Sequence, residues 1–396
     1  MKLEAGKMKE YDFVFVIPAQ TIFGYPPGGI NIFYRLACHL AANRQNVAII
    51  SVRYKYKIPE RFVTDRNRAS NINTNPDLPK LATFAIDKAS KIAFTNLALL
   101  KFFQIALGND YDYTTLDNVD MIFKDENDYS GVKTKRIFAG AWPTAYYVSS
   151  FIKNNHETEG FYIIQNFEDN PLFSGKSFIY AKQSYKLKEL KKIVICDGLK
   201  KKFVGDEPLQ FHVGVDENLF KPKTKIGERN PYTVMFSLRV DPSKGSKYLL
   251  KAIHVLKKSS DKYRFIATGN VPPRSVPKFI EYHYKPSNKV LVELYNSASI
   301  FIYTSVVEGF GSPPLEAMAC GCLTITTDCV GVHEYAKDGF NCILVPIRNS
   351  TSIVEAVRSI TTRPIPYKRL LSKNGIATAK RFTYSMMNDS FSSLFR

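Results

Sequence analysis

The stretch Glu308-Gly-Phe-Gly-Ser-Pro-Pro-Leu-Glu316 decides how the rest of this 396-residue chain is interpreted. It follows an apolar run at 300–304, and a helix is expected at its two prolines because proline suits the first helical turn. The free N–H groups of that helix start, with Gly309 and Gly311, predict an anion-binding site. Acids beside such a site make sense if they accept hydrogen bonds from sugar or ribose hydroxyls. Acids that only favour the helix dipole are the alternative.

Apolar runs that suit buried strands alternate with helical patterns along the chain, which is typical of parallel α/β sheets. One series precedes residue 210 and a second follows it, so we predict two doubly wound domains. The predicted strands lie at 11–18, 46–52, 136–140, 161–165, 192–196, 212–216, 232–238, 263–268, 300–304, 323–327 and 342–346. The predicted helices lie at 30–43, 88–107, 246–258, 289–297 and 314–319.

The quoted stretch resembles the E-x7-E signature of retaining GT-B glycosyltransferases, especially glycosyltransferase family 4. The similarity covers about residues 190–346, and the order of its motifs is specific. The matching segments are Gly214-Val-Asp216, Ser237-Leu-Arg239, Glu316-Ala-Met-Ala-Cys-Gly321, Asp328-x-Val-Gly-Val-His-Glu334, Asp338-Gly-Phe-Asn341 and Leu344-Val-Pro346.

The resemblance implies a GT-B architecture, in which two Rossmann-like doubly wound domains face each other across a cleft. It implies an N-terminal acceptor-binding domain at 1–209 and a C-terminal nucleotide-sugar-binding domain at 210–375. Residues 376–396 are expected to form a C-terminal helix that crosses back to the N-terminal domain.

Three residues have catalytic roles by this resemblance. It implies that Arg239 and Lys244 grip the donor diphosphate and stabilise it as it leaves, while Glu308 contacts the transferred sugar. Fixed cations lower the barrier for a leaving group that gains negative charge. Glu316 is expected to accept hydrogen bonds from the ribose hydroxyls. Solvated surface charges are the alternative for Arg239 and Lys244.

Further positions follow from the same motifs. Donor contacts are implied for Gly309, Phe310, Gly311, Ser312, Gly28 and Gly29. Many relatives carry a His near the reacting sugar, but the corresponding segment 162–169 has none. Gln165, Asn166 or Glu168 are therefore the candidates for that place, on the acceptor side.

No metal site is expected. The six cysteines are scattered without the paired spacing of a zinc site. Asp110-Tyr-Asp112 resembles a metal-chelating pair, but no apolar strand leads into it. We expect no metal and no cofactor, with the nucleotide-diphosphate sugar as donor substrate.

The charge is the unusual feature of the composition. Lys plus Arg is 55 and Asp plus Glu is 36, which gives a formal net charge of +19. Such an excess predicts a polyanionic partner. The basic stretches gather in the predicted acceptor domain, which suits a lipid-phosphate-linked glycan at an anionic membrane surface. Helix 88–107 could lie in that interface or pack as a crossover helix, and the run 182–202 could bind there or be a solvated face.

We therefore predict a retaining, metal-independent hexosyl- or deoxyhexosyltransferase that moves a sugar from a nucleotide-diphosphate donor to a glycan, lipid-linked or protein-linked acceptor. No membrane span or signal peptide is expected, which predicts a cytoplasmic enzyme, peripheral on the inner face of the membrane if it binds there. The alternatives are a nucleic-acid-binding protein, which the charge motivates, and an inactive nucleotide-sugar-binding module. No nucleic acid partner is expected, since no recognisable nucleic-acid module occurs.

Overall fold

The computed structural model describes residues 8–18, 28–54 and 118–396. The predicted helix 88–107, the Asp110/Asp112 pair and most of the loop before Gly28 lie outside the described residues. The chain forms two units, the first made of Met1–Ile164 and Ser174–Ile193, the second of Gln165–Phe173 and Val194–Arg396. The predicted domain boundaries and the crossing of 376–396 stay predictions.

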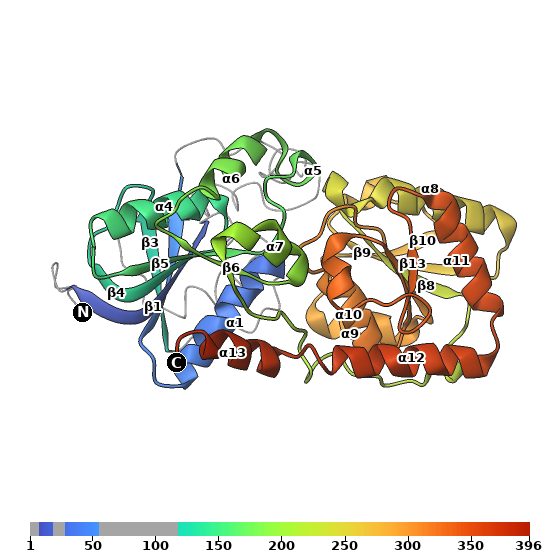
Figure 1. The fold of residues 1–396 in the computed structure, drawn as a ribbon. Coiled ribbons are helices and arrows are strands. Elements are labelled where there is room, and N and C mark those ends of the chain that lie inside the picture. The colour runs from blue at the N-terminus through green and yellow to red at the C-terminus, as the bar shows by residue number, and fades with distance from the viewer. Residues whose placement is uncertain (1–7, 19–27, 55–117) are drawn as a thin grey trace, which may run out of the picture. The chain divides into compact units, whose positions relative to one another are not determined.

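The first sheet has seven strands in the order β3-β2-β1-β4-β5-β6-β7. Figure 1 labels β1, β3, β4, β5 and β6 of this sheet. The pairings of β1 with β2 and β4, of β2 with β3 and of β4 with β5 are parallel. The centre of β1 is buried along its length because it lies between two neighbours and under helices. The strands are β1 (Lys9–Pro18), β2 (Val47–Arg53), β3 (Val119–Asp125), β4 (Val132–Ala139), β5 (Glu159–Ile164), β6 (Lys191–Val194) and β7 (Leu209–Gln210). The helices along this part of the chain are α1 (Gly28–Ala42), α4 (Trp142–Lys153), α5 (Pro171–Ser174), α6 (Phe178–Ser184) and α7 (Asp197–Lys202).

The second sheet has six strands in the order β10-β9-β8-β11-β12-β13, and every neighbouring pair is parallel. The strands are β8 (Thr233–Leu238), β9 (Arg264–Gly269), β10 (Ile280–Tyr284), β11 (Ile300–Tyr303), β12 (Leu323–Thr327) and β13 (Ile343–Val345). The helices are α8 (Ser246–Ser259), α9 (Asn288–Ser297), α10 (Ser312–Ala319), α11 (Ser350–Thr362), α12 (Ile365–Ala379) and α13 (Tyr384–Ser393).

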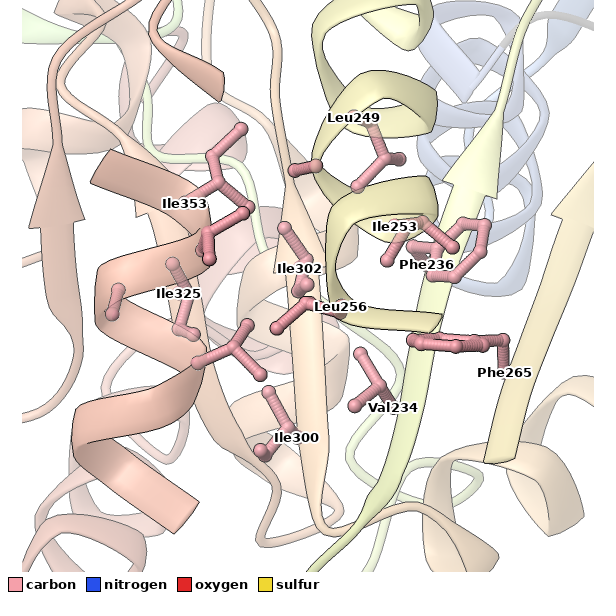
Figure 2. Packing of buried hydrophobic residues seen from close by; sticks show 14 of the residues in the cluster. Val234, Phe236, Leu249, Ile253, Leu256, Phe265, Ile300, Ile302, Ile325 and Ile353 are labelled. Carbon is pink, nitrogen blue, oxygen red and sulfur yellow. The ribbon is translucent and has the colours of Figure 1, made fainter. Parts of the chain in front are cut away.

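A hydrophobic core packs this second sheet against its helices. Phe236 of β8 and Ile302 of β11 meet Leu249 and Ile253 of α8, all fully buried, as Figure 2 shows. These residues recur at helical and strand spacing, so each element turns its apolar face inward. The core fixes the positions of the strand ends, where the candidate site lies.

The prediction of two doubly wound α/β sheets is confirmed. The sequence interpretation was wrong where it placed a strand at 212–216, which forms only an isolated bridge at Val215, and where it left out β3 and β10. Both lie at the edge of their sheets, and their sequences, VDMIFKD and IEYHY, mix charged with apolar residues. Only part of such a strand is buried, so its apolar signal is weak. No helix among the described residues is long and apolar enough to cross a bilayer.

Candidate functional site

The candidate site lies at the carboxyl ends of β8 and β11, which are neighbours in the second sheet. From β8 the chain proceeds to β9 and β10 on one side, whereas β11 is followed by β12 and β13 on the other. Ligands of open α/β sheets bind outside the carboxyl strand ends at such a reversal of strand order. Arg239 and Lys244 follow β8, and Glu308 follows β11.

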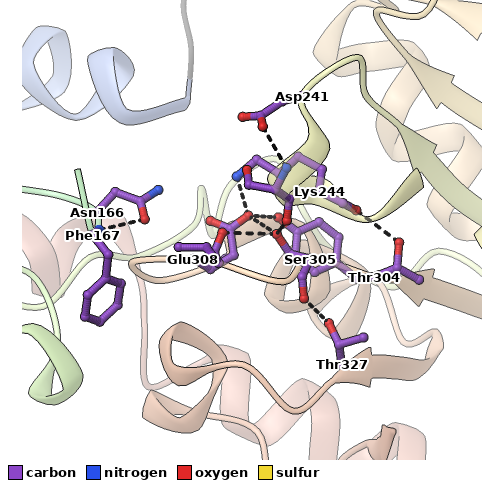
Figure 3. Close-up of polar contacts among 12 residues, drawn as sticks. Asn166, Phe167, Asp241, Lys244, Thr304, Ser305, Glu308 and Thr327 are labelled. Carbon is purple, nitrogen blue, oxygen red and sulfur yellow. Dashed lines mark hydrogen bonds and ion pairs between the residues drawn. The ribbon is translucent and has the colours of Figure 1, made fainter. Parts of the chain in front are cut away.

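Glu308 is buried and is held through one of its two oxygens. Its Oε1 accepts hydrogen bonds from Lys244 Nζ at 2.5 Å, from Ser305 Oγ at 2.9 Å and from the hydroxyl of Tyr303 (Figure 3). Among the described residues, none donates a hydrogen bond to Oε2. Burial and the neighbouring carboxylate raise the pKa of Tyr303 well above its usual range, so this hydroxyl stays protonated as a donor. The arrangement fixes the carboxylate and leaves Oε2 for a ligand.

The loops after β8 and β11 are locked together through their backbones. The carbonyl oxygen of Ser243 accepts from Val306 N at 2.7 Å, and Thr304 Oγ1 donates to the Lys244 carbonyl at 3.1 Å. Gly245 has φ +67°, and a Cβ there would lie 2.0 Å from the Thr304 carbonyl oxygen. Only glycine combines a favourable positive φ with the absence of a Cβ, so Gly245 lets the two loops come close enough for Lys244 to reach Glu308.

The segment Gln165–Phe173 packs against this site within the second unit. A Cβ added to Gly309 would lie 1.8 Å from the carbonyl oxygen of Gln165, so the two backbones touch. Figure 3 shows Asn166 on the side of Glu308 away from Lys244. Lys244 Nζ also lies 5.9 Å from the centre of the Phe173 ring.

The same segment is fixed at a second point. Lys202 Nζ bonds both carboxylate oxygens of Asp169 at 2.6 Å, and Glu168 is buried. The predicted trio Gln165, Asn166 and Glu168 therefore belongs to a segment that the structure groups with the residues around Glu308.

Glu316 forms a second polar centre, on α10. Its Oε2 accepts from the hydroxyl of Tyr295 at 3.0 Å. Burial raises the pKa of Glu316 to about 7, while the Tyr295 hydrogen bond and the charge of Arg239 act to lower it. A carboxylate near Arg239, poised to ionise near neutral pH, suits an acceptor for ligand hydroxyls.

The start of α10 has the predicted geometry. Gly311 is its N-terminal cap with φ +83°, and the two prolines follow in the first turn. The hydroxyl of Tyr335 donates to the carbonyl of Gly311, and the ring of Phe310 is buried against the ring of Tyr335. Ser312 is the first helical residue, so the backbone N–H groups here form the start of a helix, as the sequence predicted.

Comparisons with known proteins agree with this arrangement. Residues 217–378 match the family model described as glycosyl transferases group 1. This region is similar to that family. A related enzyme of Campylobacter jejuni, N,N'-diacetylbacillosaminyl-diphospho-undecaprenol alpha-1,3-N-acetylgalactosaminyltransferase, is 24% identical over 174 residues, 42% of this chain and 45% of its own. The D-inositol 3-phosphate glycosyltransferase of Saccharomonospora viridis is 23% identical over 209 residues, 46% of this chain and 48% of its own. The matches thus span about half the length of these curated relatives.

Solved structures share the fold over nearly the whole chain. The sucrose-phosphate synthase of Thermosynechococcus elongatus has a TM-score of 0.66 at 15% identity and covers 98% of both chains. Anabaena HepE, solved in complex with UDP and glucose, has a TM-score of 0.66 at 12% identity and covers 97% of this chain and 99% of its own. The fold is therefore that of GT-B glycosyltransferases.

The glycosyl transferases group 1 region contains site residues that sequence reasoning missed. Tyr303 and Ser305 hold Glu308, and Tyr295 holds Glu316. The one available signal was the position of two hydroxyl residues: Tyr303 ends the apolar strand Ile300–Tyr303, and Ser305 lies just after it. Tyr295 gave no signal, because a tyrosine at an inward position of a helix is usually part of the core.

The first unit holds the remaining predicted residues, Gly28 and Gly29. They open α1, which follows β1 at the point where the strand order of the first sheet reverses. As to metals, no cluster of three His, Cys, Asp or Glu side chains occurs in the described part of the chain. The expectation of a metal-free site stays a prediction.

Proposed function

We propose that this protein is a glycosyltransferase that moves a sugar from a nucleotide-diphosphate donor to an acceptor, with retention of anomeric configuration. The observation that carries the proposal is the joint position of the Lys244–Glu308 pair and of Arg239 and Glu316 at the reversal of strand order. Cations and ionisable carboxylates lie together at the carboxyl ends of the strands. The cations suit the phosphates of such a donor, and the carboxylates suit its hydroxyls.

Each side chain has a role in this scheme. The ammonium of Lys244 has three donors and gives one to Glu308, so two are left for phosphate oxygens. Arg239 supplies the second cation. The two cations together stabilise the leaving diphosphate as it takes up the electron pair of the broken sugar–phosphate bond. Glu316 accepts from the ribose, and Oε2 of Glu308 accepts from a hydroxyl of the transferred sugar. The charge comes from these side chains and the start of α10, so the reaction needs no metal.

The relatives support a donor class and an acceptor class. The HepE complex with UDP and glucose supports a nucleotide-diphosphate hexose or deoxyhexose, bound through Gly309, Phe310, Gly311 and Ser312. The name of the C. jejuni relative supports a glycan acceptor carried on a lipid diphosphate. Such an acceptor lies at an anionic bilayer, which suits a cytoplasmic protein bound to the inner face of the membrane. Asn166 and its neighbours in Gln165–Phe173 then face the acceptor.

Thermal denaturation with UDP, GDP and ADP and their sugars tests the donor site, because a bound ligand raises the melting temperature by mass action. At least one nucleotide should stabilise the wild type, and Arg239→Ala should lose that effect. Arg264→Ala is the matched control. Arg264 is the first residue of β9, so it lies at the amino ends of the strands, away from the site, and it pairs with Glu281.

Three outcomes would count against the proposal. In the first, none of the nucleotides or nucleotide sugars stabilises the wild type. In the second, Arg264→Ala loses as much stabilisation as Arg239→Ala. In the third, the protein binds RNA or DNA with a steep salt dependence and no nucleotide, which favours the nucleic-acid alternative. Once a donor is known, proton NMR of the product shows whether the anomeric configuration is retained.

A further inference from the structure

The first unit carries an exposed apolar pair on α6. Ile179 and Tyr180 are 51% and 57% exposed, although they are adjacent and large. The inner face of the same helix, with Ala181 and Ser184, is buried, and α6 packs beside α4 (Figure 1). Single exposed apolar side chains are common on protein surfaces, but an adjacent pair that includes an aromatic ring is less so.

Tyr180 is held in its outward position. Its ring stacks on Trp142 with centroids 6.1 Å apart and planes 19° apart. The hydroxyl of Tyr146 donates to the Tyr180 carbonyl at 2.8 Å, which ties the turn of α6 to α4. A ring that is already fixed loses little conformational entropy when it inserts into a partner surface.

The sequence around this pair is strongly basic. Lys176, Lys182, Lys186 and Lys188 are all exposed, and residues 170–188 contain no Asp or Glu. None of these four lysines forms an ion pair with a described residue. Other lysines of the unit do have carboxylate partners, namely Lys9, Lys124, Lys133, Lys135, Lys153 and Lys191. Among the described residues of the first unit, the exposed lysines without a carboxylate partner therefore lie in and next to α6.

We propose that the α6 face, made of Lys176, Ile179, Tyr180, Lys182, Lys186 and Lys188, docks the protein onto an anionic lipid bilayer. Apolar and aromatic side chains that are flanked along the chain by lysines match the bilayer interface, where rings lie at headgroup depth and ammonium groups reach the phosphates. A nucleic acid gives the lysines a partner but gives Ile179 none. The inference adds a location to the acceptor chemistry proposed above, and it can hold or fail apart from donor binding.

Sedimentation with vesicles tests the proposal. The wild type should bind vesicles of phosphatidylcholine mixed with phosphatidylglycerol, but not vesicles of phosphatidylcholine alone. Lys182→Gln with Lys186→Gln should weaken binding roughly thirtyfold, from the typical contribution of each lysine near an anionic surface. Ile179→Ser should remove the binding that persists at raised salt, because the apolar contribution is not screened.

The matched control is Lys133→Gln with Lys135→Gln, which removes the same charge from β4, where both lysines pair with acids. Its binding should stay close to that of the wild type. Trp142 is the only tryptophan of the chain and stacks under Tyr180, so vesicles with brominated acyl chains should quench its fluorescence.

Four results would overturn the inference. The wild type could fail to sediment with anionic vesicles, or both lysine pairs could weaken binding equally, which indicates diffuse charge. Binding without quenching of Trp142 places the contact elsewhere, for example in residues 55–117. Finally, the protein could bind duplex DNA but no vesicles, and the α6 variants could weaken that DNA binding. Nucleotide binding, measured on the same variants, should be unchanged, so a failure here is distinct from a failure of the donor site.

Discussion

Replacing Glu316 by Gln removes a carboxyl group whose pKa burial raises to about 7. In the unfolded chain the same group ionises at its usual, lower pKa. Between the two values the folded state keeps a proton that the unfolded state has lost, so the free energy of unfolding falls as pH rises. Above about pH 7 the folded state holds an ionised carboxylate in a poorly solvated place. Gln keeps an acceptor for the Tyr295 hydroxyl but has no charge, so this loss of stability with pH should vanish.

The size of the effect follows from the two pKa values. A rise from 4.5 to about 7 corresponds to about 3 kcal/mol, at roughly 1.4 kcal/mol for each pKa unit. Glu316 is partly exposed, and water screens part of this, so we expect about 2 kcal/mol. At pH 5 the two proteins should be about equally stable, whereas at pH 8 Glu316→Gln should be the more stable one. The same variant should bind nucleotides less tightly, since an amide oxygen accepts hydroxyl protons less strongly than a carboxylate.

Urea denaturation followed by circular dichroism at pH 5, 6, 7 and 8 measures this difference. Trp142 lies in the first unit, so its fluorescence does not report on the second. Glu293→Gln controls for the loss of an exposed carboxylate, because Glu293 lies on α9 and pairs with Lys223. Parallel stability curves for wild type and Glu316→Gln over the whole range would refute the reasoning, since burial would then not act on Glu316.

Two further substitutions test how the site is held. Tyr303→Phe removes a buried hydrogen-bond donor to Glu308, so it should cost about 1–3 kcal/mol of stability and lower transfer activity. Tyr263→Phe, in the core away from the site, should change neither. Equal losses of stability in thermal denaturation would contradict this. Gly309→Ala forces a Cβ against a backbone carbonyl oxygen 1.8 Å away, so it should cost about 1–3 kcal/mol of stability and weaken nucleotide binding. A Cβ at Gly205 meets open space, so Gly205→Ala should match the wild type in thermal denaturation and in nucleotide binding.

The fold was predictable where elements are buried on both faces. β1, β8 and β11 are continuous apolar runs because neighbours and helices surround them, so their sequence carries the signal by itself. The edge strands β3 and β10 were missed because their burial depends on contacts that no local pattern records. The same applies to the segment Gln165–Phe173, whose grouping with the second unit follows from tertiary packing.

The candidate site was predictable in its charged residues but not in the groups that hold them. Glu308, Glu316, Arg239 and Lys244 stand in motifs whose order carries information. Tyr303 has no motif of its own, since a tyrosine that ends an apolar strand usually packs in a core. Its role follows only from the geometry that brings its hydroxyl to the Oε1 oxygen of Glu308.

The net charge of +19 can now be divided by what each cation contacts. At the proposed donor site Lys244 is paired with Glu308, so without a ligand this place offers little unbalanced charge to an arbitrary polyanion. The lysines of the α6 face have no such pairing, and we expect them to attract anionic surfaces in general. Competition separates the two sites, because a nucleotide should not displace the protein from anionic vesicles, whereas raised salt should. Displacement by nucleotide at constant ionic strength would mean that one basic surface serves both ligands, and the assignment of separate sites to donor and bilayer would then fail.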